Sequence, residues 1–301
     1  MQSFYSRGKL LLTGEYVVLD GALSLAVPSK FGQHLTEQPI NESKLIWNSI
    51  NKDGKIWFEN SFSLNKGKIT ADKKNEMSMR LANILNAAKT LNKDFLKSNI
   101  GFSVTTTLEF SRSWGLGTSS TLINNIALWA NVDAYKLLEM TFGGSGYDIA
   151  CAQNNSALTY QLKGNDIQIN LVDFNPEFKQ ELFFIYLNKK QDSREGISTY
   201  NLQKKEITNS ISEISNITSK VLNCNSLKGF ETLITEHEAI ISDIIKVKPV
   251  KQSHFNDYNG AIKSLGAWGG DFILATGNLE EMNYFKKKGY KTILSFNDIL
   301  L

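Results

Sequence analysis

Apolar residues recur along this chain at two different spacings, one typical of helices and one typical of strands. Over residues 76–91 they lie three or four positions apart, which predicts an amphipathic helix. Over residues 102–110 apolar and polar positions alternate, which predicts a strand. Helical spacing returns over residues 122–129. We therefore expect a strand, a loop and a helix between residues 102 and 129.

The same two spacings predict the other elements. Strands are expected over residues 9–13, 16–19, 45–64 with a turn at 52–55, 182–187, 272–275 and 291–296, and a hairpin over residues 157–161 and 167–172. Helices are expected over residues 132–140, 207–221, 230–245, 255–263 and 279–288. Met77 and Met79 are expected in the core. No internal repeat occurs. We expect one domain over residues 1–177 and an α+β domain over residues 178–301.

The loop between the strand and the helix reads Ser111-Arg-Ser-Trp-Gly-Leu-Gly-Thr-Ser-Ser-Thr121. Its glycines let a ligand approach the backbone closely, and a helix start offers free N–H groups to an anion. This favours a phosphate site, although hydroxyl residues at a helix start also serve as ordinary caps. A Walker A loop is excluded because no Gly-Lys-Ser/Thr follows, and Ser120 replaces the third glycine of a dinucleotide fingerprint.

Composition narrows the classes of protein that remain. Of 301 residues, 42% are hydrophobic and 21% charged, as in ordinary globular proteins. The net charge of +3 predicts neither nucleic acid nor membrane as a partner. Cys151 and Cys224 lie far apart, and the histidines are scattered, so no structural zinc site is expected. With no leader and no apolar run of membrane length, we expect a cytoplasmic protein. The expected oligomeric state is a monomer or a homodimer.

Other polar residues stand out beside glycines. Asp148 follows Phe142-Gly-Gly-Ser-Gly-Tyr147, where it is either a helix cap or a carboxylate directed into a site. Lys9 and Glu15 flank a short apolar run, and exposure at strand ends is the simpler interpretation of both. A polar loop is expected over residues 188–199, and its polar side chains are either solvated or face an anionic substrate; they are Lys189, Lys190, Ser193, Arg194 and Ser198.

Three glycine-rich segments follow one another in a particular order. They are Gly8-Lys-Leu-Leu-Leu-Thr-Gly-Glu-Tyr-Val-Val18, Gly115-Leu-Gly-Thr-Ser-Ser120 and Leu265-Gly-Ala-Trp-Gly-Gly-Asp271. With Gly144-Ser-Gly-Tyr-Asp148, they resemble the signature motifs of the GHMP kinases, most of all phosphomevalonate kinases and then mevalonate kinases. The resemblance covers nearly the whole chain. It implies a two-domain α+β fold, with an N-terminal domain like domain 2 of ribosomal protein S5 and a ferredoxin-like C-terminal domain.

The resemblance also implies roles for single residues. Asp148 matches the aspartate that accepts the proton of the substrate hydroxyl, and Lys9 matches the lysine beside the transferred phosphoryl group. Ser119 matches the serine that binds Mg²⁺. Together with Ser119, the residues expected to bind ATP are Trp114, Gly115, Leu116, Gly117, Thr118, Ser120 and Gly269. The residues expected to contact substrate are Lys9, Glu15, Ser145, Gly146, Arg194, Gly266 and Ala267.

Some positions depart from the family pattern. Arg7 stands where proline or alanine is usual, and Trp268 replaces a small residue in the third motif, which is expected to narrow the site. Leu137 stands where mevalonate kinases place a magnesium-binding glutamate, while Glu139 lies two positions away. This weakens the similarity to mevalonate kinases in particular and leaves the metal shell incomplete.

The function implied is ATP- and Mg²⁺-dependent phosphorylation of phosphomevalonate or mevalonate. A phosphate acceptor carries little proton for Asp148 to remove, so Asp148 would then act mainly by positioning. Three alternatives remain: a sugar or amino-alcohol kinase, a diphosphomevalonate decarboxylase, which the first motif disfavours, and a ligand sensor on the same fold. A sensor has no need of both Lys9 and Asp148, and this chain contains both.

Overall fold

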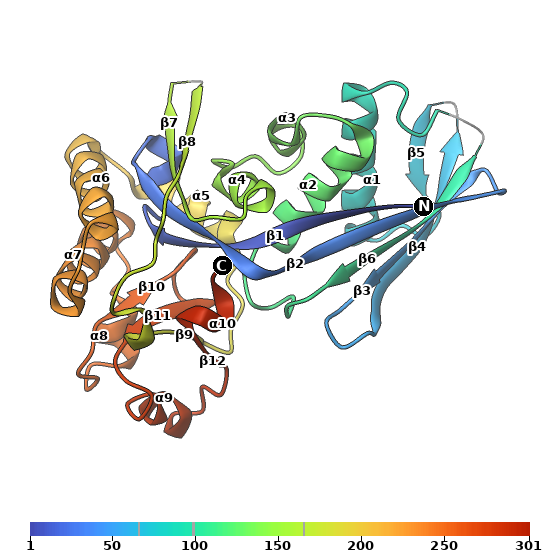
Figure 1. Ribbon diagram of the computed structural model, residues 1–301. Helices are drawn as coiled ribbons and strands as arrows, with labels where there is room; N and C mark the ends of the chain where they lie inside the picture. Colours follow the sequence, from blue (N-terminus) through green and yellow to red (C-terminus); the bar gives the residue numbers. More distant parts are fainter. Residues whose placement is uncertain (66, 98–99, 165) are drawn as a thin grey trace. The chain divides into compact units, whose positions relative to one another are not determined.

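A computed structural model describes residues 1–65, 67–97, 100–164 and 166–301 of the chain (Figure 1). Its packing forms two compact units. The first unit comprises Met1–Gly8, Phe31–Arg112 and Leu116–Gln153, and the second comprises Lys9–Lys30, Ser113–Gly115 and Asn154–Leu301. The chain therefore passes between the units several times, and the expected domains 1–177 and 178–301 stay a prediction.

The first unit is a sheet with helices packed on one face (Figure 1). The end of β2 (Ser24–Ile40) pairs antiparallel with β6 (Gly101–Leu108), and β6 runs parallel to β3 (Lys44–Ile50). Antiparallel pairing continues through β4 (Ile56–Asn65) to β5 (Lys68–Ala71). The helices are α1 (Glu76–Leu91), α2 (Thr118–Ala130), α3 (Ala134–Glu139) and α4 (Tyr147–Gln153).

The core of the first unit lies between this sheet and its helices. Trp47 and Phe62 from the strands pack with Leu85 of α1 and Ile126 of α2, and all four side chains are buried. The helix predicted over residues 76–91 is confirmed at both ends. Met77 and Met79 are a correction, because both side chains are exposed in the first turn of α1, at 40% and 48%. Side chains lean toward the N-terminus of a helix, so those of the first turn project past its end.

The second unit contains an antiparallel sheet in the order β10 (Ile262–Ser264), β11 (Phe272–Thr276), β9 (Leu182–Tyr186) and β12 (Ile293–Ser295). A hairpin of β7 (Leu158–Lys163) and β8 (Asp166–Leu171) pairs with the start of β2. The strand β1 (Gln2–Thr13) pairs with β2 and ends in this unit. The helices are α5 (Ser193–Gln203), α6 (Thr208–Leu222), α7 (Leu227–Ile245), α8 (Val250–His254), α9 (Asn283–Lys287) and α10 (Phe296–Ile299). Short 3₁₀ helices span Val17–Asp20 and Lys179–Glu181.

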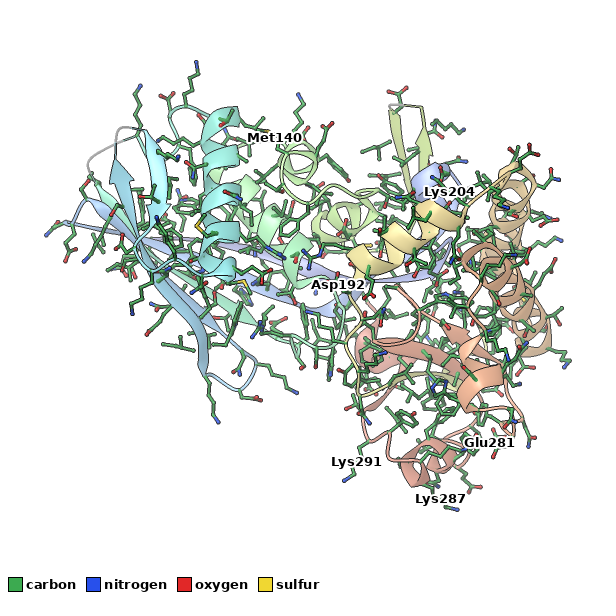
Figure 2. The ribbon with its side chains drawn as sticks, turned by 180° about the vertical axis from the view of Figure 1, so that it is seen from behind. Met140, Asp192, Lys204, Glu281, Lys287 and Lys291 are labelled. Carbon is green, nitrogen blue, oxygen red and sulfur yellow. The ribbon has the colours of Figure 1, made fainter. Side chains whose placement is uncertain are left out.

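Three expected elements are corrected in this unit. Residues 16–19 belong to a turn and a 3₁₀ helix, because Gly14 and Gly21 both take positive φ and fold the apolar residues between them inward. The segment 188–199 is not a loop throughout, because it contains the start of α5, where Asp192 is labelled in Figure 2. Asp192 is the N-cap and accepts the N–H of Arg194 at 2.9 Å. The helix expected over residues 255–263 does not form, because α8 already ends at His254 and β10 begins at Ile262. Among the described residues, no helix is both long enough and apolar enough to cross a membrane.

Candidate phosphate-binding and catalytic site

The glycine loop enters α2 through Gly117, which takes a left-handed conformation at φ 90° and makes no side-chain cap bond. Ser120 Oγ and Thr121 Oγ1 lie 2.9 and 3.0 Å from the Gly117 carbonyl oxygen and turn back to it. Ser119 remains exposed beside them. Because no hydroxyl caps this helix start, its first N–H groups are left for an anion. The hydroxyl residues at this helix start therefore do not serve as ordinary caps.

Asp148 is the second residue of α4, in the same unit. The turn before it is built from glycines, since Gly143, Gly144 and Gly146 all take positive φ, which other residues rarely adopt. Asp148 is half-buried, and its Oδ1 accepts the N–H of Ile149 at 3.1 Å. Burial, together with the nearby Cys151 and Asp148, raises the pKa of the Tyr135 hydroxyl. Ser145 and Gly146, which were expected to contact substrate, lie in the turn that presents Asp148.

Residues of all three motifs meet in the second unit, at Gly115. Lys9 in β1 donates from its Nζ to the carbonyl oxygen of Gly115 at 3.0 Å. Asp271, the last residue of the third motif, occupies the space in front of the Gly115 α-carbon. A Cβ placed there would lie 2.3 Å from Asp271 Oδ2, so only glycine fits. The neighbouring Trp114 ring packs edge-on against Phe272 with ring centroids 5.6 Å apart.

Asp271 itself is held by the segment before α5. Its N–H donates to the Lys189 carbonyl at 2.7 Å, and its Oδ1 accepts the N–H of Gln191 at 3.1 Å. Burial raises the pKa of this carboxyl, while Gln191, Lys9 and Lys190 act in the opposite direction. The sequence marks this aspartate as the end of the third motif but indicates no role for it. Its place directly after two glycines was the available signal.

The rest of the third motif forms a tight turn in the second unit. Gly266 and Gly269 take positive φ, and so does Trp268 between them. The Trp268 side chain is buried, and its Nε1 has no hydrogen-bond partner among the described residues. Ala267 is also buried. The bulky side chain is therefore accommodated inside the unit, and its expected narrowing of a ligand site stays a prediction.

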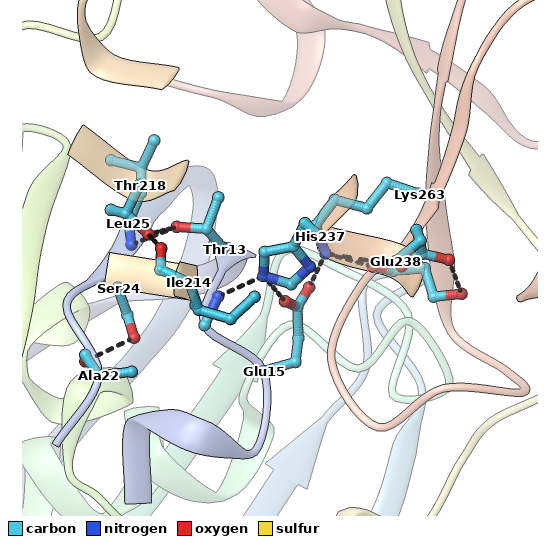
Figure 3. Close-up of polar contacts among 12 residues, drawn as sticks. Thr13, Glu15, Ala22, Ser24, Leu25, Ile214, Thr218, His237, Glu238 and Lys263 are labelled. Atoms are coloured by element: carbon cyan, nitrogen blue, oxygen red, sulfur yellow. Dashed lines mark hydrogen bonds and ion pairs between the residues drawn. The ribbon is translucent and has the colours of Figure 1, made fainter. Parts of the chain in front are cut away.

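Glu15 lies in a buried polar cluster of the second unit (Figure 3). Its carboxylate accepts a hydrogen bond from Lys263, which also lies 3.9 Å from Glu238. His237 Nε2 accepts the N–H of Gly14 at 2.8 Å, so its 3.3 Å approach to Glu15 is not an ion pair. Burial and Lys263 lower the pKa of His237, which keeps the ring neutral. The partners of Glu15 are thus internal, and its expected contact with substrate stays a prediction.

The remaining candidates are more scattered. Arg194 is exposed near the start of α5, where it pairs with Asp192 at 2.8 Å. Leu116 is buried, so only its backbone is available to a ligand. Leu137 is part of the core of the first unit, and Glu139 is exposed. Among the described residues, no group of three or more His, Cys, Asp or Glu side chains is arranged to hold a metal ion.

Comparison with known proteins identifies the class of fold. No protein-family model and no curated protein sequence matches this chain. Solved structures do match, among them mevalonate kinases, a phosphomevalonate kinase and a galactokinase, so the resemblance of the motifs is confirmed at the level of the fold. The α+β, two-domain GHMP kinase fold class is confirmed in the same way.

Particular structures show how broad this likeness is. The Streptococcus pneumoniae phosphomevalonate kinase, solved with phosphomevalonate and AMPPNP, has a TM-score of 0.71 and 17% identity over 98% of this chain and 100% of that one. The Lactococcus lactis galactokinase, solved with galactose, has a TM-score of 0.71 and 14% identity over 98% and 92%. The Methanococcus jannaschii mevalonate kinase has a TM-score of 0.68 and 16% identity over 97% and 96%. Sugar and mevalonate kinases are thus equally similar in fold.

Proposed function

We propose that this protein is an ATP-dependent small-molecule kinase that transfers the γ-phosphoryl group of ATP to phosphomevalonate or mevalonate. The observation that carries the proposal is the meeting of the three motifs at Gly115. There Lys9 donates to the loop carbonyl at 3.0 Å, and Asp271 closes the opposite side. Phosphoryl transfer needs positive charge fixed beside the phosphate groups, and a lysine held on a glycine loop supplies it.

The start of α2 supports ATP as the phosphoryl donor. Its first N–H groups have no side-chain cap, and the loop before them has no side chain at Gly115 or Gly117. Such a helix start attracts phosphate through its N–H groups and its dipole. In this proposal the loop binds the ATP phosphates, and Lys9 acts on the group being transferred.

Ser119 would hold Mg²⁺ in this proposal, because its side chain is exposed at the start of α2 and offers a hard oxygen ligand of the kind that Mg²⁺ prefers. The buried Leu137 adds no ligand. Mg²⁺ usually keeps several waters and binds substrate phosphates, so few protein oxygens are needed. When bound, the ion would neutralise charge that develops on the phosphates.

Asp148 would act on the acceptor. A carboxylate in this position orients the acceptor oxygen and takes its proton as the bond to phosphorus forms. A hydroxyl acceptor, as in mevalonate, needs that proton transfer. A phosphate acceptor, as in phosphomevalonate, needs mainly orientation. A sugar kinase is the second candidate, because the galactokinase matches this fold as well as the phosphomevalonate kinase does.

The test is release of ADP from ATP and Mg²⁺ with mevalonate, phosphomevalonate, galactose or homoserine as acceptor. Turnover is expected with one of the two mevalonate compounds. Asp148→Asn should lower kcat by about 100-fold or more on a hydroxyl acceptor, and by less on a phosphate acceptor. Asp53→Asn, at an exposed turn of the same unit, is the matched control and should retain full activity.

Other results would contradict parts of the proposal. Turnover of galactose or homoserine alone would reject the mevalonate compounds as substrates but keep the kinase. Binding of AMPPNP without turnover of any acceptor would favour a ligand sensor. A protein that neither binds AMPPNP nor releases ADP would reject the kinase proposal altogether.

A further inference from the structure

Two adjacent asparagines, Asn124 and Asn125, lie in the middle of α2 and are almost completely buried, with exposures of 1% and 0%. Both the position inside a helix and the burial are unfavourable for the stability of the fold. Asparagine competes with the helix backbone for hydrogen bonds, and burying its amide costs free energy unless every polar group finds a partner. The neighbours Ile123 and Ile126 show that apolar residues suit this part of the helix. A reason for the two amides must therefore lie in what they contact.

The contacts form one continuous series, which we call the asparagine network. Gln153 Nε2 donates to Asn124 Oδ1 at 2.9 Å, and Asn124 Nδ2 donates to Ser6 Oγ at 2.9 Å. Ser6 Oγ donates to Asn125 Oδ1 at 2.8 Å, and Asn125 Nδ2 donates to the Gln33 backbone carbonyl at 2.9 Å. The series therefore joins α4, α2, β1 and β2, all through residues of the first unit.

The direction of every hydrogen bond in this network is determined by its last acceptor. The Gln33 carbonyl can only accept, so Asn125 must turn its NH₂ group toward it and its oxygen toward Ser6. The Ser6 hydroxyl then donates to that oxygen and must accept from Asn124. Asn124 in turn presents its oxygen to residue 153. A donor is therefore required at position 153, and Gln153 supplies one.

The two ends of the network reach the two halves of the proposed chemistry. At one end, the Gln33 side chain accepts from Thr121 Oγ1 at 2.8 Å, and the same hydroxyl lies 3.0 Å from the Gly117 carbonyl of the glycine loop. At the other end, Gln153 is the last residue of the seven-residue helix α4, which carries Asp148. Small buried residues also pack α4 on α2, but packing alone permits sliding, whereas directed hydrogen bonds do not.

We propose that the asparagine network holds the helix that carries Asp148 in register with the glycine loop, which makes Asn124, Asn125 and Gln153 positioning residues for phosphoryl transfer. The inference rests on the proposed function. Phosphoryl transfer depends on alignment of donor and acceptor, and a displacement of about 1 Å lowers the rate by about 100-fold. A buried network in which the amide oxygen and nitrogen of both asparagines have partners resists such a displacement.

The test starts at the exposed end of the network, where substitutions leave the core intact. Gln153→Met keeps the length of the side chain and removes the donor, while Gln153→Lys keeps a donor. We expect Gln153→Met to lower kcat by about tenfold or more, with KM for ATP changed by less than about twofold. Gln153→Lys should restore most of kcat. Gln161→Met is the matched control, because that glutamine also donates one side-chain bond, to the Gly21 carbonyl, but lies outside the network.

The outcomes separate this inference from the proposed function. A kcat that is unchanged in Gln153→Met, in a protein whose parent is active, would overturn the network alone. A fall in kcat that Gln161→Met reproduces, or that Gln153→Lys does not relieve, would overturn it as well. A parent protein that binds no AMPPNP and releases no ADP would reject the proposed function, and the positioning role with it.

Discussion

At the scale of single residues, the buried cluster around Glu15 concentrates titratable groups away from water. Glu238 is 2% exposed, and its Oε2 accepts the Ser264 hydroxyl at 3.1 Å. Burial raises the pKa of Glu238 to about 8, with Lys263 opposing and Glu15 adding to the rise. Burial also raises the pKa of Glu15, against the effect of Lys263. The carboxyl groups of Glu15 and Glu238 thus share the ammonium group of Lys263, and burial favours the protonated form of the carboxyl groups.

Glu238 should make the stability of the protein depend on pH. In the unfolded chain this carboxyl loses its proton near pH 4.5, but in the folded protein only near pH 8. The folded state therefore binds more protons between these values, and the free energy of unfolding falls as pH rises through this window. In Glu238→Gln this fall in the free energy of unfolding, on the order of 3 kcal/mol between pH 5 and 8, should be absent. Urea denaturation of both proteins over this pH range measures the difference.

The comparison with Glu238→Gln isolates Glu238 together with its electrostatic coupling to Glu15 and Lys263. Neutral His237 is present in both proteins and contributes the opposite slope, because the unfolded chain takes up a proton below pH 6.5 and the buried ring does not. Parallel stability curves for the parent and Glu238→Gln across this range would contradict a protonated Glu238.

At the scale of elements, the glycine loop shows how one missing side chain lets two segments approach. Gly115 has a φ of 67°, and a Cβ there would lie 2.3 Å from the Asp271 carboxylate. Backbone strain alone is a modest penalty for a non-glycine residue, on the order of 1 kcal/mol. The overlap of a Cβ with Asp271 would also displace the loop itself. A side chain at position 115 should therefore weaken nucleotide binding by more than backbone strain alone explains.

Gly115→Ala should weaken AMPPNP binding by about tenfold or more, because the loop must move away from Asp271 and Lys9. Gly164→Ala is the matched control. Its φ of 62° is similar, and a Cβ there would meet nothing within 4 Å. Calorimetric titration with AMPPNP and Mg²⁺ compares the two variants. Equal affinities for both would show that the contact between Gly115 and Asp271 does not shape the phosphate site.

At the scale of the whole molecule, the proposed function predicts a stability that depends on nucleotide and metal. A ligand that binds only the folded state stabilises it by about 2.7 kcal/mol at a concentration 100 times its Kd. AMPPNP with Mg²⁺ should therefore raise the Tm of the chain by several degrees, and EDTA should remove most of the increase. Thermal unfolding followed by circular dichroism measures this. An unchanged Tm with AMPPNP at millimolar concentration would contradict nucleotide binding.

Most of the fold followed from local patterns where those patterns were strong. The spacing over residues 76–91 predicted α1 with its correct ends, and alternation predicted β6 and the β7–β8 hairpin. The strand predicted over residues 16–19 was wrong, because valine and leucine suit a strand as well as a buried 3₁₀ helix. The helix α5 was missed although Asp192 and Glu195 mark a helix start, because its polar surface hid the apolar period.

The sequence by itself determined the class of fold, through the order of its motifs, and the positions where glycine permits unusual backbone angles. Only the tertiary structure decided that Lys9 and Asp271 meet at Gly115, that Glu15 is enclosed with Lys263, and that Asn124 connects to Gln153. The physical reason is the separation along the sequence over which each effect acts. Propensity, capping and periodicity act over a few neighbouring residues, whereas these contacts join residues from 29 to 248 positions apart and depend on the path of the whole chain.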